Sequence, residues 1–121
     1  MKKIVLVKPS VKKSFFQAKS VCESICGNLY FPSTLSESLI ARNIAREHGA
    51  PDKNIWFRIS DEDKEGIWKD PDNKEVLMFT NWVPRQPDNY RGNENYGIFW
   101  HAEKWNDAPA AYGVSYILCE L

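Results

Sequence analysis

The sequence contains no long hydrophobic run, no excess charge of either sign, and only three cysteines and two histidines among its 121 residues. A membrane-spanning helix needs a run of about 18 apolar residues, and no stretch approaches that length. The 16 Lys and Arg residues balance the 16 Asp and Glu residues. This balance argues against nucleic acid as the main partner, because phosphate binding needs a basic excess. We therefore predict no membrane span and no nucleic-acid partner.

The chain also lacks internal repeats, low-complexity tracts and an obvious linker. Hydrophobic residues make up 43% of it and charged residues 26%, which is ordinary for a globular protein. Its length suits one domain, so residues 1–121 are predicted to form a single domain. Near the start, the apolar stretch over residues 4–7 is too short for a signal peptide and is interrupted by Lys8. We interpret this stretch as the first strand, in a chain whose signal was removed or never present.

Two capping patterns predict two helices. The pairs are Ser14 with Gln17 and Thr34 with Glu37. In each pair a hydroxyl residue precedes a Gln or Glu by three positions, which is typical of a capping box. Apolar residues repeat at helical spacing after each pair. The first helix is expected to end with Gly27 as its C′ residue, and the second to cover residues 35–48 and end at Gly49.

Short runs of aromatic and β-branched residues in the second half predict strands. They cover residues 54–59, 76–82, 97–100 and 115–120. Residues 105–113 are expected to link the last two strands. The order of strand, helix, helix and then several short strands indicates the α+β class.

Residues 83–95 are almost wholly polar, with two Pro and three Asn, and predict a long irregular loop. This loop and the segment after it contain candidate oxygen ligands for a hard cation. They are Gln86, Asp88, Glu94, Asn106 and Asp107. Such oxygens suit Ca²⁺, whereas Zn²⁺ prefers Cys or His. If the Gln86–Pro87 bond were cis, the side chains on either side of Pro87 could point the same way. On composition alone, a solvated loop without a metal is equally open.

The amino-acid sequences of these segments resemble the primary calcium and sugar site of the C-type lectin domain. Gln86-Pro87-Asp88, then Glu94, then Trp105-Asn106-Asp107 follow the family's order and spacing. The segments 56–59 (W-F-R-I) and 80–82 (T-N-W) resemble its W-I-G-L strand and its T/S-N-W motif. The resemblance to the short, collectin-like form implies two helices packed on small antiparallel sheets, with a long irregular calcium-binding loop. It also implies a disulfide between Cys22 and Cys119.

The resemblance further implies a function and a set of site residues. A calcium ion would be held by the five oxygen ligands named above, and neighbouring sugar hydroxyls would complete its coordination. In the family the Q-P-D triplet goes with galactose, so galactose-containing glycans are the expected partners. Tyr90 stands where galactose-binding members place an aromatic ring against the sugar, although it can also be an exposed loop tyrosine.

Three departures from the family pattern accompany this resemblance. Tyr96 and Ala110 stand where the family places its second disulfide. An auxiliary calcium site would use the residues Asp61, Glu65, Asn89, Glu94 and Asn95. Two of these are Asn where Asp is often found, which weakens calcium binding. Cys26 has no counterpart, and it is either an idle thiol or forms an intermolecular disulfide in a secreted homodimer.

Other functions remain alternatives. The chain can be a C-type lectin-like domain that binds a protein or another non-sugar ligand, although such members often lose one or more of the five ligands. A glycosidase would need two carboxyls with separated pKa values, and one ion explains the acids better, so we predict that the chain is not an enzyme. Trp56, Trp82 and Trp105 are expected in the core, while Trp68 and Trp100 receive no role.

Overall fold

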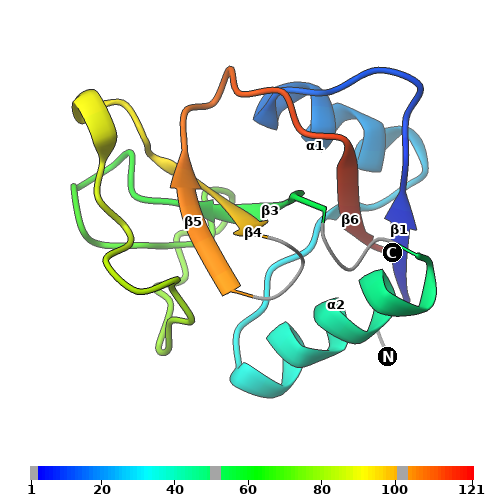
Figure 1. The fold of residues 1–121 in the computed structure, drawn as a ribbon, viewed down its shortest axis with the longest axis horizontal. Coiled ribbons are helices and arrows are strands. Elements are labelled where there is room, and N and C mark those ends of the chain that lie inside the picture. Colours follow the sequence, from blue (N-terminus) through cyan, green and yellow to red (C-terminus); the bar gives the residue numbers. More distant parts are fainter. Residues whose placement is uncertain (1–2, 50–52, 101–103) are drawn as a thin grey trace.

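Six strands form one sheet, and the two helices lie against opposite faces of it (Figure 1). The structure is a computed structural model that describes residues 3–49, 53–100 and 104–121. Its elements, in chain order, are β1 (Ile4–Val7), α1 (Phe15–Ser24), β2 (Asn28–Leu29), α2 (Leu35–Glu47), β3 (Ile55–Ser60), the 3-10 helix η1 (Tyr90–Gly92), β4 (Tyr96–Trp100), β5 (Lys104–Ala108) and β6 (Tyr116–Glu120). No helix within these ranges is long and apolar enough to span a bilayer.

The sheet has the strand order β1-β6-β3-β4-β5, with β2 also paired to β6. All pairs are antiparallel except β3 with β6, which run parallel. The α+β class is therefore confirmed, but the strands form one mixed sheet instead of separate small antiparallel sheets. The first strand pairs with the last, and the backbone N–H of Leu121 donates to the carbonyl of Lys3 at 2.8 Å. The first and last strands of the sheet, β1 and β6, thus lie side by side (Figure 1).

The core has two halves because side chains alternate between the faces of a strand. All six residues of β3 are buried. Trp56 points to the face covered by α1 and packs edge-on against Phe15, with ring centroids 5.6 Å apart. Phe57 points to the opposite face, where Ala41 and Ala45 of α2 complete the cluster. Each helix therefore buries one stripe against one face of the same central strand.

The N-termini of both helices follow their capping residues. At α1, Ser14 and Gln17 exchange both bonds of the predicted capping box. At α2, Thr34 accepts from the backbone N–H of Glu37, at 3.1 Å. The Glu37 carboxylate accepts from the backbone N–H of Ser33, at 2.8 Å. The second helix is thus capped, with its Glu bonded one residue earlier than the sequence pattern predicts.

The C-terminus of α1 differs from the prediction by one residue. Cys26, not Gly27, takes the left-handed C′ conformation, with a φ of 63°. The N–H of Cys26 donates to the carbonyl of Glu23, and that of Gly27 to the carbonyl of Cys22, which is the Schellman pattern. Gly27 is required for another reason: a Cβ there would lie 2.4 Å from the carbonyl oxygen of Glu120.

Three strand predictions need correction. Residues 76–82 were predicted as a strand, but they make only the isolated bridges of Val76 with Lys69 and of Trp82 with Trp105. Residues 105–113 were predicted as a link, but β5 covers most of their first half. The two-residue strand β2 was not predicted. The first error arises because Leu77, Phe79 and Trp82 pack on the α2-side core as part of a loop, without a continuous ladder.

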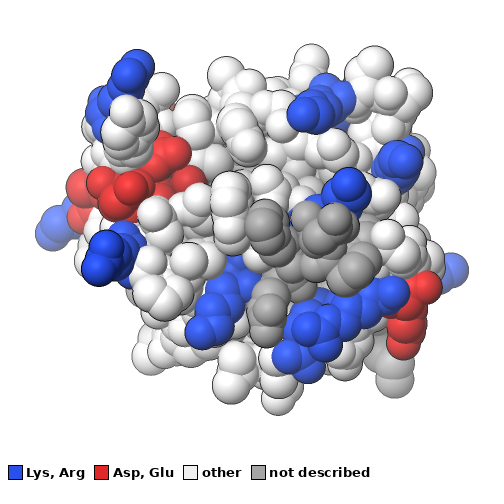
Figure 2. Space-filling view, viewed as in Figure 1, with Lys and Arg blue, Asp and Glu red and all other residues white. Residues whose placement is uncertain are grey.

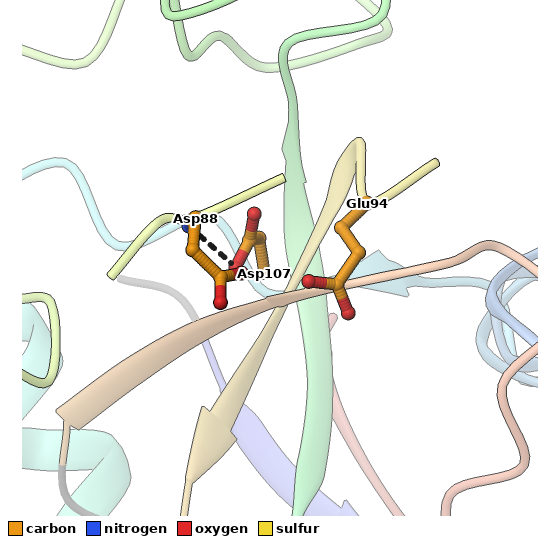
Figure 3. Close-up of side chains that lie close together, drawn as sticks. All are labelled: Asp88, Glu94 and Asp107. Atoms are coloured by element: carbon orange, nitrogen blue, oxygen red, sulfur yellow. Dashed lines mark hydrogen bonds between the residues drawn. The ribbon is translucent and has the colours of Figure 1, made fainter. Parts of the chain in front are cut away.

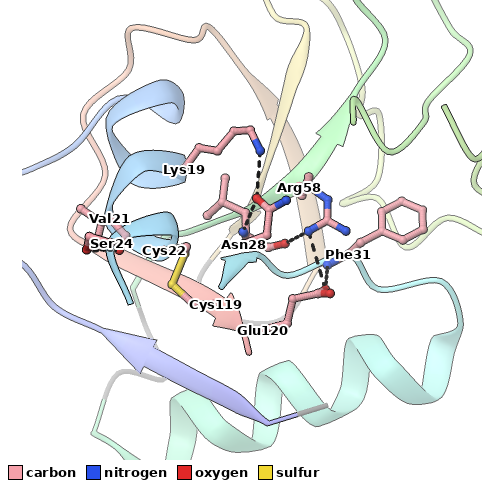
Figure 4. The surroundings of a disulfide bond; sticks show 10 residues. Lys19, Val21, Cys22, Ser24, Asn28, Phe31, Arg58, Cys119 and Glu120 are labelled. Carbon is pink, nitrogen blue, oxygen red and sulfur yellow. Dashed lines mark hydrogen bonds and ion pairs between the residues drawn. A yellow bond between two sulfur atoms is a disulfide. The ribbon is translucent and has the colours of Figure 1, made fainter. Parts of the chain in front are cut away.

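The structure joins Cys22 and Cys119, the pair that the family resemblance implies, and links α1 to β6 (Figure 4). Near this bond lies a polar cluster that the sequence did not reveal. The guanidinium of Arg58 is 7% exposed and pairs with both carboxylate oxygens of Asp70, each at 3.0 Å. It also donates to the carbonyl of Leu29. A buried charge is stable only when paired in this way.

Tyr96 and Ala110, which stand where the family places its second disulfide, are held by packing and hydrogen bonds. Tyr96 is buried, and its ring lies 4.3 Å from that of Phe15, centroid to centroid. Its hydroxyl donates to the Glu62 carboxylate. Ala110 is partly buried in the same cluster, and its carbonyl accepts from the N–H of Phe15 at 2.9 Å. Aromatic packing and hydrogen bonds therefore tie these segments to α1.

Tryptophans account for much of the core. Trp56 on the α1 side and Trp105 on the α2 side are fully buried, and Trp82 is partly buried, as predicted. Trp68 is also buried, and its ring stacks at a tilt against Trp82 with centroids 4.8 Å apart. Trp100 differs from the other four because its side chain is 36% exposed.

The left-handed backbone at Cys26 yields a prediction for stability. A side chain with a Cβ is strained at this φ, whereas glycine is not. Cys26→Gly should therefore raise the free energy of unfolding by about 0.5–1 kcal/mol, or Tm by about 4 °C. Thermal unfolding of the monomer would measure this. Cys26→Ala is the matched control, since it removes the thiol and keeps the strain; an equal gain in Cys26→Ala would contradict the explanation.

Candidate metal centre

The segment 83–95 is the long irregular loop that its composition predicts, with η1 as its one regular element. Two backbone bonds fasten the start of this loop to β5. The N–H of Val83 donates to the carbonyl of Trp105, and the N–H of Trp105 to the carbonyl of Asn81, both at 2.8 Å. The Gln86–Pro87 peptide bond is cis. The loop thus leaves the sheet beside β5 and turns back at Pro87.

Strand β5 supplies the other half of the candidate site, and Asp107 connects the two halves. Its carboxylate accepts from the backbone N–H of Asp88 at 3.3 Å (Figure 3) and from that of Asn89 at 2.7 Å. The Asp107 side chain is almost fully buried. The loop is therefore held against the end of β5 by a carboxylate that is itself a predicted cation ligand.

Three carboxylates meet at this junction. One oxygen each of Asp88, Glu94 and Asp107 lies within 4.8 Å of the other two. The side chains come from the loop and from β5 and face a common space (Figure 3). On the outer surface, acidic side chains gather over the same end of the molecule (Figure 2). Oxygens that share one Ca²⁺ are at most about 5 Å apart, because each lies 2.3–2.6 Å from the ion.

The two predicted amide ligands, Gln86 and Asn106, carry oxygens that are unpaired within the described part of the chain. The Gln86 Oε1 and Asn106 Oδ1 atoms are buried and have no hydrogen-bond partner among the described residues. Leaving a buried polar atom unpaired costs about 1–3 kcal/mol, so such atoms need an explanation. A cation bound by oxygen ligands supplies one, since amide oxygens coordinate Ca²⁺ directly. The five residues therefore fit a calcium ion, and their oxygens would hold it.

The electrostatics of the cluster favour an added positive charge, either a proton or a cation. Burial raises the pKa of Glu94 to about 7, assisted by a hydrogen bond with Asp88 and by the charges of Asp107 and Asp88. The backbone N–H of Tyr90 opposes this rise by donating to Glu94 at 3.1 Å. Burial likewise raises the pKa of Asp107. Mutual repulsion and burial thus both disfavour three ionised carboxylates at this position.

The residues expected for an auxiliary ion are only partly assembled. Asp61 is buried, and its Oδ1 has no hydrogen-bond partner among the described residues. Burial, then a hydrogen bond and charge from Asp61, raise the pKa of Glu65. The amide of Asn89, however, donates to Glu65 at 2.9 Å and accepts from the N–H of Glu94 at 3.0 Å. Asn95 contributes its backbone carbonyl, which accepts from the N–H of Asp61 at 3.1 Å.

The auxiliary site therefore differs in kind from the primary cluster. The Asn89 side chain acts as a link between Glu65 and the backbone of Glu94, and its oxygen already has a partner. No group of three or more acids, cysteines or histidines forms at this position among the described residues. Occupancy by a second ion stays a prediction.

The aromatic residue predicted to contact sugar lies at the edge of the loop. The Tyr90 ring is 60% exposed, and the guanidinium of Arg91 lies 5.2 Å from its centroid. A second aromatic group was not predicted: Trp100 and Tyr112 line a cavity that begins at the cluster. Alternation along β4 places Trp100 on the same face as Ile98, but the sequence alone did not reveal the cavity.

Comparison with known proteins gives consistent results. A family model described as the lectin C-type domain matches residues 11–121. Over 96 residues the chain is 32% identical to pulmonary surfactant-associated protein D of Bos taurus, covering 79% of this chain and 25% of that protein. Over 102 residues it is 26% identical to a perlucin-like protein of Mytilus galloprovincialis, covering 78% of this chain and 62% of that protein. The chain thus spans less than two thirds of either relative.

Among solved structures, a similar fold occurs in the carbohydrate-recognition domain of cow CD23, crystallised in the presence of a GlcNAc2Man3 oligosaccharide. The TM-score is 0.84 at 25% identity, and the match covers 99% of this chain and 87% of that one.

The raised pKa of Glu94 predicts a pH dependence. Without calcium, the folded state binds more protons than the unfolded state between pH 4.5, the ordinary value, and about 7. The contribution of Glu94 to stability therefore falls as pH rises through this window. Calcium needs the carboxylate deprotonated, so its affinity should rise over the same window. At a fixed calcium concentration, about 100-fold above the Kd at pH 8, calcium should raise Tm by roughly 10 °C at pH 8. The same concentration should raise Tm by much less at pH 5.5, where the Kd is higher.

Scanning calorimetry with calcium or with EDTA at both pH values measures this. Glu94→Gln should remove much of the pH dependence of the calcium-free protein. Glu75→Gln, an exposed position outside the cluster, should behave like the wild type. A Tm that ignores calcium at both pH values would contradict the assignment.

Proposed function

Because the chain belongs to the C-type lectin domain family, we propose that it is a calcium-dependent lectin with a preference for galactose-type sugars. Domains of this family bind glycans and generally bind Ca²⁺, and the family assignment agrees with the prediction that the chain is not an enzyme. One observation supports the proposal most directly. Three carboxylates lie within 4.8 Å of one another, and the amide oxygens of Gln86 and Asn106, two of the predicted ligands, are buried without hydrogen-bond partners among the described residues.

The proposed roles follow from the donor and acceptor properties of the side chains. Bound calcium would supply a Lewis acid to which two neighbouring sugar hydroxyls can coordinate. The oxygens of Gln86 and Asn106 would coordinate the ion, which would leave their amide nitrogens free to donate to hydroxyl oxygens. The carboxylates of Asp88 and Glu94 accept the hydroxyl protons. Each hydroxyl would then contact a donor, an acceptor and the cation. The geometry of the two hydroxyls would therefore decide which sugars bind.

Specificity would depend on the loop residues, not on β5. Gln86 and Asp88 exchange the donor and acceptor sides relative to an E-P-N triplet. The exchange favours the axial 4-hydroxyl of galactose over the equatorial pair of mannose. Tyr90 would pack on the apolar face of the sugar. The exposure of its ring supports this role, because an exposed aromatic ring can contact the C–H groups of a sugar. The Arg91 guanidinium over the ring restricts the ring's position.

Two further parts of the proposal concern location and assembly. The Cys22–Cys119 disulfide supports secretion, because such bonds persist in oxidising compartments. Cys26 is exposed at the end of α1 and is free among the described cysteines. A disulfide between two copies through Cys26 would give a homodimer, and two linked sites raise the avidity of weak single-site sugar binding.

Affinity chromatography tests the sugar preference. The protein should be retained on galactose-agarose with calcium and released by EDTA or by free galactose. Asn106→Asp keeps an oxygen ligand but removes the amide donor, so it should weaken retention more than calcium binding. Retention that persists in EDTA, or displacement by mannose but not by galactose, would argue against the proposal.

A paired substitution in the loop provides the specificity control for this experiment. Gln86→Glu combined with Asp88→Asn should shift the preference toward mannose and leave calcium binding in place. Such discrimination by hydroxyl geometry is expected to change relative affinities by about tenfold or more.

Gel electrophoresis tests the proposed dimer. Wild-type protein refolded under oxidising conditions should run as a dimer without reductant and as a monomer with it, while Cys26→Ser should be a monomer under both conditions. A monomer band for the wild type under both conditions would exclude the interchain bond.

A further inference from the structure

A cavity of about 180 Å³ adjoins the acidic cluster. Glu94, Asn106 and Asp107 of the cluster line it together with Trp100 and Tyr112. Gln86, Asp88 and Tyr90 do not line it. The cavity is therefore distinct from the position of the tyrosine expected to contact the primary sugar.

The register of β4 and β5 explains how this cavity is built. Ile98 pairs with Asn106, and Trp100 pairs with Lys104. Directly opposed residues share a face, and every second residue along a strand returns to it. Trp100 therefore follows Ile98 on the face that carries Asn106. A turn after β5, in which the N–H of Tyr112 donates to the carbonyl of Pro109 at 3.0 Å, returns Tyr112 to the cavity.

The lining of the cavity combines three kinds of side chain. Glu94 and Asp107 contribute carboxylates, and Ile98 contributes an apolar side chain that is almost fully buried. Trp100 and Tyr112 contribute two aromatic rings, with exposed fractions of 36% and 42%. Single exposed aromatics need no explanation. Two that line one cavity together with a polar cluster match a ligand that carries both polar groups and an amphipathic ring.

We propose that Trp100 and Tyr112 form a second subsite, which binds the saccharide residue linked to the galactose held at the acidic cluster. The inference rests on the proposed function, because the first ring must be positioned by the cluster. A pyranose ring has an apolar face of C–H groups and a rim of hydroxyls. The rigid faces of Trp and Tyr pack on such a surface with little loss of side-chain freedom. The ligand class is thus a galactose-terminated oligosaccharide.

Calorimetric titration with calcium present tests the subsite. The probes are methyl β-galactoside, a set of β-galactosyl disaccharides that includes lactose, and phenyl β-galactoside. At least one disaccharide should bind about tenfold tighter than methyl β-galactoside. Trp100→Ala and Tyr112→Ala should each reduce that gain, and the double variant should abolish it, while the affinity for methyl β-galactoside stays within about twofold of the wild type.

Two controls separate binding from folding. Phe16→Ala removes an exposed aromatic ring of α1 that lies outside this cavity, so it should keep the full disaccharide gain. Trp100→Phe keeps a ring and should restore most of the gain that Trp100→Ala loses.

The alternative outcomes are distinguishable. If methyl β-galactoside binds with calcium but no disaccharide binds tighter, or if the gain survives the double variant, the subsite is wrong and the proposed function stands. A gain for phenyl β-galactoside alone would assign the cavity to an apolar aglycone and would overturn the saccharide assignment. If no probe binds in a calcium-dependent way, the proposed function fails and the subsite fails with it.

Discussion

The contact between the Asp107 carboxylate and the backbone N–H groups of Asp88 and Asn89 is the constraint on which the candidate site depends. It joins a rigid strand to a loop in which Arg85, Asn89 and Arg91 all have positive φ values. Such backbone persists only where the surroundings hold it, and the positions of the family's second disulfide carry Tyr96 and Ala110. The carboxylate that holds the loop is buried, and its pKa is raised. The order of the loop and the compensation of its negative charge are therefore linked, and a cation bound at the cluster would provide both.

The helices were predictable because their signals are local. A capping residue, a stripe of apolar residues and a left-handed C-terminus all lie within a few positions of one another, so Ser14 and Thr34 identified both starts. Strand β5 was missed because its sequence, K-W-N-D-A, does not alternate between apolar and polar as a half-buried strand should. Asn106 and Asp107 stand at positions where packing alone would favour apolar residues, since their side chains serve the cluster. The alternating pattern of a strand is therefore absent where polar side chains face the acidic cluster.

Long-range partners could not be predicted from local sequence. Arg58 lies in the middle of a fully buried strand, where a charge contradicts the apolar pattern, and its partner Asp70 lies in a loop twelve residues later. The sequence motifs identified Gln86, Glu94 and Asn106. They did not reveal that the amide oxygens of Gln86 and Asn106 are buried without hydrogen-bond partners among the described residues. Composition allowed a solvated loop, and only three-dimensional placement distinguishes that loop from a cluster with unpaired buried amides.

The division of the site between strand and loop has a consequence for specificity. Asn106 and Asp107 are positioned by β5, whose register with β4 is continuous from Tyr96 to Trp100. Gln86 and Asp88 come from a loop whose contacts with the sheet are a few hydrogen bonds. Under the proposed function, changes at the loop positions would alter which hydroxyls fit and would leave the core and the strand unchanged. Changes at Asp107 remove a cation ligand and the anchor of the loop together, so they cannot alter specificity without also losing binding. Variation in sugar preference is therefore expected at the loop positions, on a strand that stays constant.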